Sequence, residues 1–145
     1  MSQVDQDASA AANHGRKWVM ASGQASSHRR VAVNDVAAVV ATGRFDEAVV
    51  WYGCVFGREP DLLPIPGVAE WQLTSTAWLQ LVTDEARAGR TAVRFGVDDL
   101  AQTRAALAER GVTTAAEPQV IADMVAVLDV ADPDGNEVSF VQELA

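Results

Sequence analysis

Hydrophobic and polar positions after residue 30 follow patterns that predict a strand, a helix and two more strands. Residues 31–42 are rich in β-branched side chains and alanine, which favours a strand. Across 45–56, apolar side chains recur at helical spacing behind an acidic first turn, and Gly57 is a suitable helix stop. A proline-rich loop then leads to two strand-like runs at 68–74 and 77–83.

The same order of patterns begins again after a short polar link. Residues 91–97 alternate as a strand, and Asp98 or Asp99 is placed to cap a helix over 100–110. The sequence Asp-Pro-Asp-Gly-Asn at 132–136 is a strong turn signal, because proline presets φ and glycine or asparagine accepts a positive φ. Further strands are predicted at 119–121, 124–131 and 137–144.

The chain therefore divides into two modules, 31–83 and 91–145, each with the order strand–helix–strand–strand–strand. Two such modules can pool their sheets, cover one face with both helices and leave a concave face open. We expect an α+β fold, a curved mixed-sheet cup with the helices on its outer face. Residues 1–30 have no sustained hydrophobic period and are expected to form a flexible tail.

The uneven distribution of ionisable residues excludes much chemistry. Residues 31–145 hold 18 acidic residues and seven arginines, a net charge of −11. Both histidines and the only lysine lie in the first 30 residues. Unless that segment folds back over a site, the predicted domain has no histidine base, no lysine Schiff base and no histidine metal ligand.

Composition also narrows the partners and the compartment. An acidic domain repels nucleic acid and anionic lipid, so we expect binding to neither nucleic acid nor membrane. No apolar run reaches the roughly 18 residues of a membrane helix. The single cysteine, Cys54, excludes an internal disulfide, which fits a reducing cytoplasm. Its apolar neighbours on the predicted helix favour inert packing over nucleophilic use.

Three motifs, in order, resemble the vicinal oxygen chelate superfamily, the group of glyoxalase I, bleomycin-resistance proteins and extradiol dioxygenases. The first is Phe-Asp-Glu-Ala-Val-Val-Trp-Tyr at 45–52, followed by Val-Phe-Gly at 55–57. The second is Val-Arg-Phe-Gly-Val-Asp-Asp-Leu at 93–100, and the third is Asp-Pro-Asp-Gly-Asn-Glu-Val at 132–138. The resemblance covers 31–145 and implies two βαβββ modules that form a cup, usually in a homodimer.

The resemblance also implies where metal-using members hold an ion, on the first and last strand of each module, usually through His, Gln or Glu. Carried over by position, these places fall at Ala37 and Gln80, and at Ala92 (or Thr91) and Ser139. Of these, Gln80 offers one weak neutral ligand, whereas metal sites need three or four ligands. We therefore expect no metal, no cofactor and no catalytic residue.

Strand alternation predicts which side chains line the cup. If Gln80 faces it, Trp78 does too, and if Ala92 faces it, so does Arg94. An aromatic wall with one arginine, one acid and neutral donors suits an organic molecule better than a metal-activated oxygen. The predicted ligand-binding residues are Val39, Trp71, Trp78, Gln80, Arg94, Asp129 and Ser139.

Several of these residues have a structural alternative. Trp78 either stacks on a ligand or packs within the sheet or a dimer. Arg94 either pairs with an internal acid such as Asp129 or binds an anionic group of a ligand, because burying an unpaired guanidinium costs free energy. Trp71 is interpreted as a wall or interface residue, and Glu70 as a solvated edge charge.

The leading hypothesis is a metal-free binding protein that sequesters an aromatic or cationic compound, such as an antibiotic, in a groove of a homodimer. The rival is an enzyme of the same superfamily, a glyoxalase-type lyase, an isomerase or a dioxygenase. It requires an atypical metal site or acid–base work by Asp129 and Arg94. A third hypothesis is an accessory domain that binds a protein partner.

Overall fold

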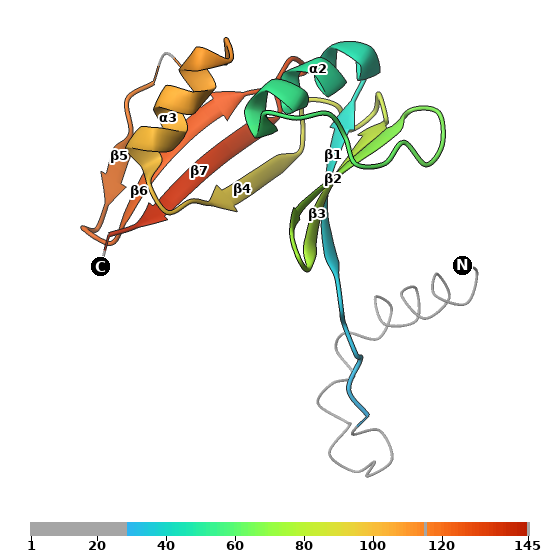
Figure 1. Ribbon diagram of the computed structural model, residues 1–145, viewed down its shortest axis with the longest axis horizontal. Helices are drawn as coiled ribbons and strands as arrows, with labels where there is room; N and C mark the ends of the chain where they lie inside the picture. Colours follow the sequence, from blue (N-terminus) through green and yellow to red (C-terminus); the bar gives the residue numbers. More distant parts are fainter. Residues whose placement is uncertain (1–28, 115, 145) are drawn as a thin grey trace. The chain divides into compact units, whose positions relative to one another are not determined.

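The computed structural model describes residues 29–114 and 116–144, and a compact unit begins at Asn34. The predicted tail, 1–30, lies outside the described residues except for its last two positions. The elements, shown in Figure 1, are β1 (Val36–Thr42), α2 (Phe45–Phe56), β2 (Val68–Thr74), β3 (Ala77–Thr83), β4 (Ala92–Gly96), α3 (Leu100–Glu109), β5 (Gln119–Ile121), β6 (Val125–Ala131) and β7 (Glu137–Glu143).

The strands form two mixed sheets with matching topology. The first sheet has the order β1-β3-β2 and the second has the order β4-β7-β6-β5. In each module the first strand pairs with the last in parallel, and the remaining pairs are antiparallel. This arrangement confirms the α+β fold with two related modules, although the strands lie in two sheets rather than one pooled sheet.

The first module has one strand fewer than predicted. In place of a further strand, a single bridge joins Leu62 to Glu70 of β2. The segment that contains Leu62 also carries Pro60, Pro64 and Pro66. Proline has no backbone N–H to donate to a ladder, so this segment cannot extend its pairing along β2.

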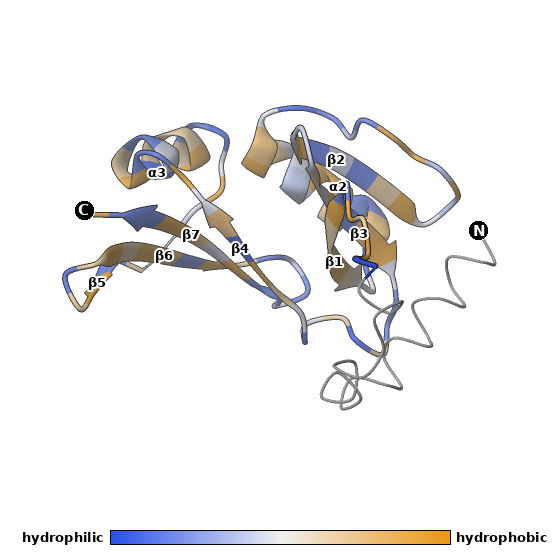
Figure 2. Ribbon diagram, turned by 90° about the horizontal axis from the view of Figure 1, so that it is seen from below, coloured by the Kyte–Doolittle hydropathy of each residue, from blue (hydrophilic) through white to orange (hydrophobic). Residues whose placement is uncertain are grey.

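Each helix covers one face of its own sheet, α2 against β3 and α3 against β6 and β7. α2 buries Ala48, Tyr52 and Val55, and it ends at Gly57 with φ 72°. The Asp99 side chain caps α3 by accepting a hydrogen bond from the backbone of Gln102. Figure 2 shows hydrophobic and hydrophilic residues side by side on α3, as expected for a helix with one buried face. The opposite face of each sheet is left open.

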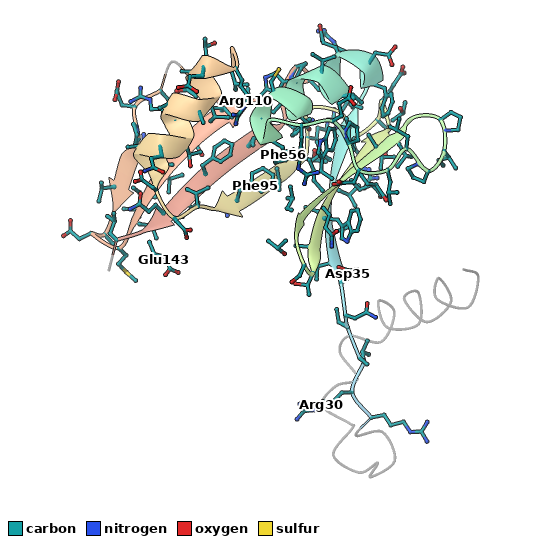
Figure 3. The ribbon with its side chains drawn as sticks, viewed as in Figure 1. Arg30, Asp35, Phe56, Phe95, Arg110 and Glu143 are labelled. Atoms are coloured by element: carbon teal, nitrogen blue, oxygen red, sulfur yellow. The ribbon has the colours of Figure 1, made fainter. Side chains whose placement is uncertain are left out.

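An aromatic series continues the core from one module into the other. Trp71 of β2 packs on Phe56 with ring centroids 5.7 Å apart, and Phe56 meets Phe95 of β4 edge to face at 5.6 Å. Phe95 in turn packs on Phe140 of β7 at 5.7 Å. Figure 3 shows Phe56 and Phe95 between α2 and β4. The two modules therefore share one hydrophobic core.

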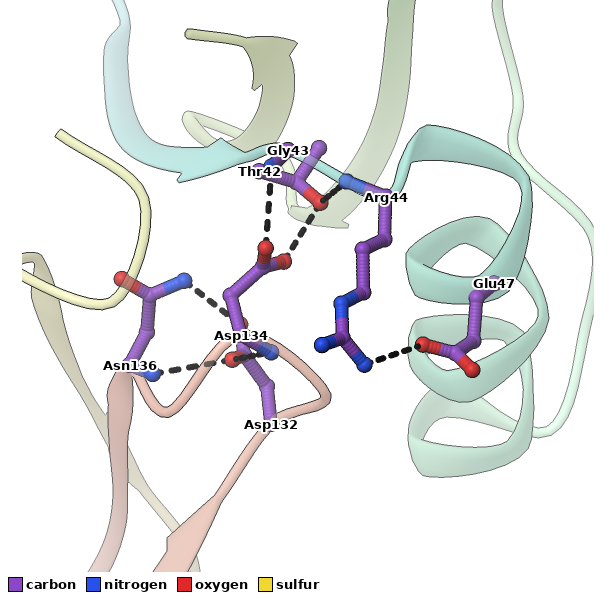
Figure 4. A network of polar contacts seen from close by, with 7 residues as sticks. All are labelled: Thr42, Gly43, Arg44, Glu47, Asp132, Asp134 and Asn136. Carbon is purple, nitrogen blue, oxygen red and sulfur yellow. Dashed lines mark hydrogen bonds and ion pairs between the residues drawn. The ribbon is translucent and has the colours of Figure 1, made fainter. Parts of the chain in front are cut away.

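The turn at 132–136 is a second link between the modules (Figure 4). The Asp134 carboxylate accepts hydrogen bonds from the Thr42 hydroxyl and, at 2.9 Å, from the Gly43 backbone N–H. The fully buried Asn136 side chain donates to the Ala41 carbonyl at 2.8 Å. The predicted turn thus holds the junction of β1 and α2.

Tyr52 extends this network into the core. Its hydroxyl donates to Asp132 at 2.7 Å, and the same carboxylate accepts from the backbone N–H groups of Asp134 and Asn136 and from the Asn136 amide. Burial, reinforced by the negative charge of Asp132, raises the pKa of Tyr52 far above its usual value.

Two more contacts tighten the junction. Gly89, in the link between the modules, has φ 80°, and a Cβ atom there would lie 2.6 Å from the Asp134 carbonyl oxygen. The Arg110 guanidinium, at the end of α3, donates to the carbonyls of Cys54 and Val55 at the end of α2. Hydrogen bonds, as well as apolar packing, therefore hold the two modules together.

Candidate functional site

The open face of the first sheet carries three of the predicted ligand-binding residues. Gln80 lies opposite Val39 in the β1–β3 register, and Trp78 lies two positions earlier on the same face. Trp78 and Gln80 are partly buried, whereas the alternate residues Leu79 and Leu81 are fully buried under α2. The alternation along β3 is the one that the sequence predicts.

Glu70 joins this group, although the sequence suggested only a solvated edge charge. It lies opposite Gln80 in the β2–β3 register, and the Gln80 amide donates to its carboxylate at 2.5 Å. Both side chains are partly buried. The first open face therefore presents an indole ring next to a hydrogen-bonded carboxylate.

Trp71, by contrast, lies in the core and not on the open face. It is fully buried, its indole N–H donates to the Arg58 carbonyl at 3.1 Å, and it lies opposite the core residue Leu79. The cause is an irregularity in the register of β2 between Gln72 and Thr74. In a regular hairpin with a two-residue turn, Trp71 would lie opposite Gln80. The bulge adds one residue to β2, so Glu70 lies opposite Gln80 instead and Trp71 turns to the core face.

The open face of the second sheet brings the other three residues into one row across neighbouring strands. Arg94 of β4 lies opposite Ser139 of β7, which lies opposite Asp129 of β6. The Ser139 hydroxyl donates to the Asp129 carboxylate at 2.5 Å. Ser139 is 1% exposed, while Arg94 and Asp129 are exposed.

The two open faces repeat the same polar pair. In each module a neutral donor on the last strand, Gln80 or Ser139, binds a carboxylate on the strand before it, Glu70 or Asp129. Among the described residues, no hydrogen bond connects one pair to the other. Glu70 was missed in the sequence because only the bulge places it opposite Gln80, although its equivalence to Asp129 in the repeat was a usable signal.

These residues do not fit the metal site that the resemblance implies. Ala37 and Ala92 have only methyl side chains, and Gln80 and Ser139 are engaged with neighbouring carboxylates. Within 29–114 and 116–144, no group of three or more His, Cys, Asp or Glu side chains is placed to hold an ion. A metal site of the usual kind needs three or four such ligands.

Two related modules, each with one helix, a parallel pair formed by its first and last strands, and an open sheet face, define the class of protein as the vicinal oxygen chelate superfamily. No family model matches the sequence, and no curated protein matches it. The glyoxalase/bleomycin resistance protein structure from Catenulispora acidiphila is 33% identical, with a TM-score of 0.70 over 74% of this chain and 96% of that one. The chain belongs to the glyoxalase/bleomycin resistance protein family.

Two more distant structures share the fold. Lactoylglutathione lyase from Agrobacterium tumefaciens is 17% identical, with a TM-score of 0.63 over 78% of this chain and 96% of that one. A glyoxalase/bleomycin resistance protein/dioxygenase from Nocardioides is 13% identical, with a TM-score of 0.62 over 82% of this chain and 89% of that one.

Neither α2 nor α3, the helices of the described residues, has the length and apolarity to cross a bilayer.

Proposed function

We propose that this protein binds a planar, cationic organic molecule on the open faces of its sheets, without a metal, and so sequesters a compound such as an antibiotic. The observation that carries the proposal is the partly buried Trp78 next to the Gln80–Glu70 pair. An indole ring attracts a flat cation through stacking and through its π face, and a nearby carboxylate adds charge attraction.

The second open face supports the same ligand chemistry. Asp129, held by Ser139, supplies a carboxylate at the place equivalent to Glu70. The net charge of −9 over the whole chain attracts cations over a longer range. Binding requires no proton transfer, so the absence of histidine and lysine from 31–145 is no obstacle. The same negative charge disfavours binding to nucleic acid. A single cysteine, which cannot form an internal disulfide, is consistent with a function in the reducing cytoplasm.

The proposal includes a homodimer in which the second copy pairs along the free edge of β1. Among the strands that the structure describes, β1 pairs with β3 alone and so lies at the edge of its sheet. Val36 is 63% exposed and Val39 is 42% exposed, and an edge strand with exposed apolar residues invites pairing. Sedimentation equilibrium is expected to give two chains per particle, with Val36→Lys shifting it toward one. A monomer at all concentrations contradicts the dimer.

Calorimetric titration with bleomycin and with 9-aminoacridine, a planar cation, tests the binding function. We expect roughly micromolar affinity, about 8 kcal/mol. Uncharged acridine, which has the same ring system, should bind more weakly. Trp78→Phe should weaken all three ligands, because phenylalanine is a smaller platform. Glu70→Gln, which preserves size and hydrogen bonding to Gln80, should weaken only the cations.

Two results contradict the proposal. One is the absence of binding across this set of compounds, which favours an accessory domain for a protein partner. The other is near-stoichiometric zinc, nickel, manganese or iron in protein purified without chelators. Bound metal would favour a lyase, an isomerase or a dioxygenase with an unusual ligand set.

A further inference from the structure

A crevice of about 520 Å³ lies between the β2–β3 hairpin, β4 and α3, and its lining includes neither Trp78 nor Gln80. Its walls are largely apolar, and they include Phe56, Phe95 and Phe140. Phe56 and Phe95, labelled in Figure 3, meet edge to face in this wall. A volume of this size is typical of pockets for small organic molecules.

The free edge of β4 supplies the crevice with backbone donors. Among the described strands, β4 pairs with β7 alone. Val97 donates its N–H to the Val141 carbonyl, and the Thr91 carbonyl accepts from the Glu137 N–H, so the backbone groups of Val97 and Thr91 point toward β7. Because bonding alternates along a strand, the backbone groups of Arg94 and Gly96 point away from β7. Both residues line the crevice.

The crevice is cationic although the chain is acidic. Arg94 and Arg110 belong to its described lining, which includes no aspartate or glutamate. Arg110 is occupied with the carbonyls of Cys54 and Val55. Arg94 forms no ion pair with any residue that the structure describes. Its guanidinium is thus the charge that a ligand in the crevice would meet.

We propose that this crevice binds an aryl carboxylate, a molecule with one aromatic ring and one carboxylate on a short chain. The ring packs among Phe56, Phe95 and Phe140, where offset and edge-to-face contacts are favourable. The carboxylate accepts from the Arg94 guanidinium and from the free N–H of Gly96. This second site shares Arg94 with the row on the second open face, but its ligand has the opposite charge to the one proposed for the open faces, so the two can be tested separately.

Three probes with one phenylpropyl body test the charge preference: 3-phenylpropanoate, 3-phenylpropan-1-ol and 3-phenylpropylamine. Calorimetry on the full chain is expected to show that the carboxylate binds about fivefold tighter than the alcohol, as a partly exposed ion pair allows. The ammonium should bind weakest. The overall negative charge opposes this order, so the order reports the local environment of the crevice.

Three variants locate the site. Arg94→Gln should remove the advantage of the carboxylate over the alcohol and leave alcohol binding unchanged. Ala106→Phe, which fills the crevice from α3, should abolish binding of both. Ala105→Phe is the matched control, because the neighbouring Ala105 is exposed and lies outside the crevice lining. Amide NMR shifts on adding 3-phenylpropanoate to the unmodified protein should be largest at Gly96.

Each of three other outcomes overturns the proposal. Equal affinity for the three probes would mean an apolar groove without an anion site. Shifts centred on Trp78 and Gln80 would place the carboxylate on the open face. No binding, together with loss of dimer in the Ala106→Phe variant, would make the crevice an interface between copies. Failure of 9-aminoacridine to bind would affect only the proposed function of the open faces.

Discussion

At the scale of single residues, the Tyr52–Asp132 hydrogen bond is the clearest case in which burial determines the ionisation of a side chain. Tyr52 is fully buried, and its hydroxyl is one of four donors to the Asp132 carboxylate. Ionising the phenol would place a second negative charge beside the first in a dry environment. The raised pKa of Tyr52 follows from this cost.

The raised pKa predicts how stability depends on alkaline pH. Tyr52 is the only tyrosine in the chain, so phenolate absorbance reports this group alone. In the unfolded chain tyrosine ionises near pH 10, whereas the folded protein keeps the proton. The free energy of unfolding should therefore fall as pH rises above about 10. No phenolate absorbance should appear before unfolding.

Tyr52→Phe is the control for this prediction. It removes one donor from a buried carboxylate, which costs about 1 kcal/mol near neutral pH. It also removes tyrosine ionisation, so the tyrosine-linked fall in stability above pH 10 should vanish. Urea unfolding at a series of pH values measures both effects. Phenolate absorbance in protein that is still folded near pH 10 would contradict the argument.

At the scale of elements, sequence reasoning succeeded where a local signal decides the structure. Helical spacing predicts α2 with the bounds that the structure has, and Gly57 and Asp99 terminate and cap the helices as predicted. Sequence reasoning failed where one extra residue shifts the pairing register of β2 against β3. The bulge in β2 exchanges Trp71 and Glu70 between the core and the open face, and no composition signal marks it.

Replacing either of two glycines of the α2 region by alanine should change the stability of the protein, in opposite directions. Gly57→Ala should destabilise by about 1 kcal/mol, because alanine resists a positive φ, and its Cβ would lie 3.2 Å from the Arg110 guanidinium. Gly53→Ala, inside the helix, should stabilise by roughly 0.5–1 kcal/mol. Thermal unfolding of the two variants measures the pair. The same sign for both would show that helix propensity does not govern this segment.

At the scale of the molecule, one core and one hydrogen-bond network join the two modules. The repeated order of elements predicts two related modules, and the repeat appears even in the Gln80–Glu70 and Ser139–Asp129 pairs. The sequence could not predict the contacts between the modules. Arg110 reaches across to α2 through its terminal atoms, and no spacing rule specifies such a long-range partner.

Arg110→Ala should weaken the whole unit rather than one module. It removes two hydrogen bonds to α2 carbonyls, at a cost of about 1 kcal/mol for partly solvated bonds. Arg104→Ala is the matched control on the same helix, because Arg104 pairs only within the second module, with the exposed Glu117. Unfolding followed by circular dichroism and by tryptophan fluorescence should give one coincident transition for both variants. Separate transitions would mean that the modules unfold independently.

The close approach of Gly89 to Asp134 has a consequence for how the polypeptide can be divided. The turn at 132–136, the aromatic series and Arg110 all bind one half to the other without using the peptide bonds of the link. Backbone continuity across the link then serves mainly to keep the halves at high effective concentration. A chain cut between Ala86 and Arg87 is expected to elute from a sizing column as a single particle that contains both fragments.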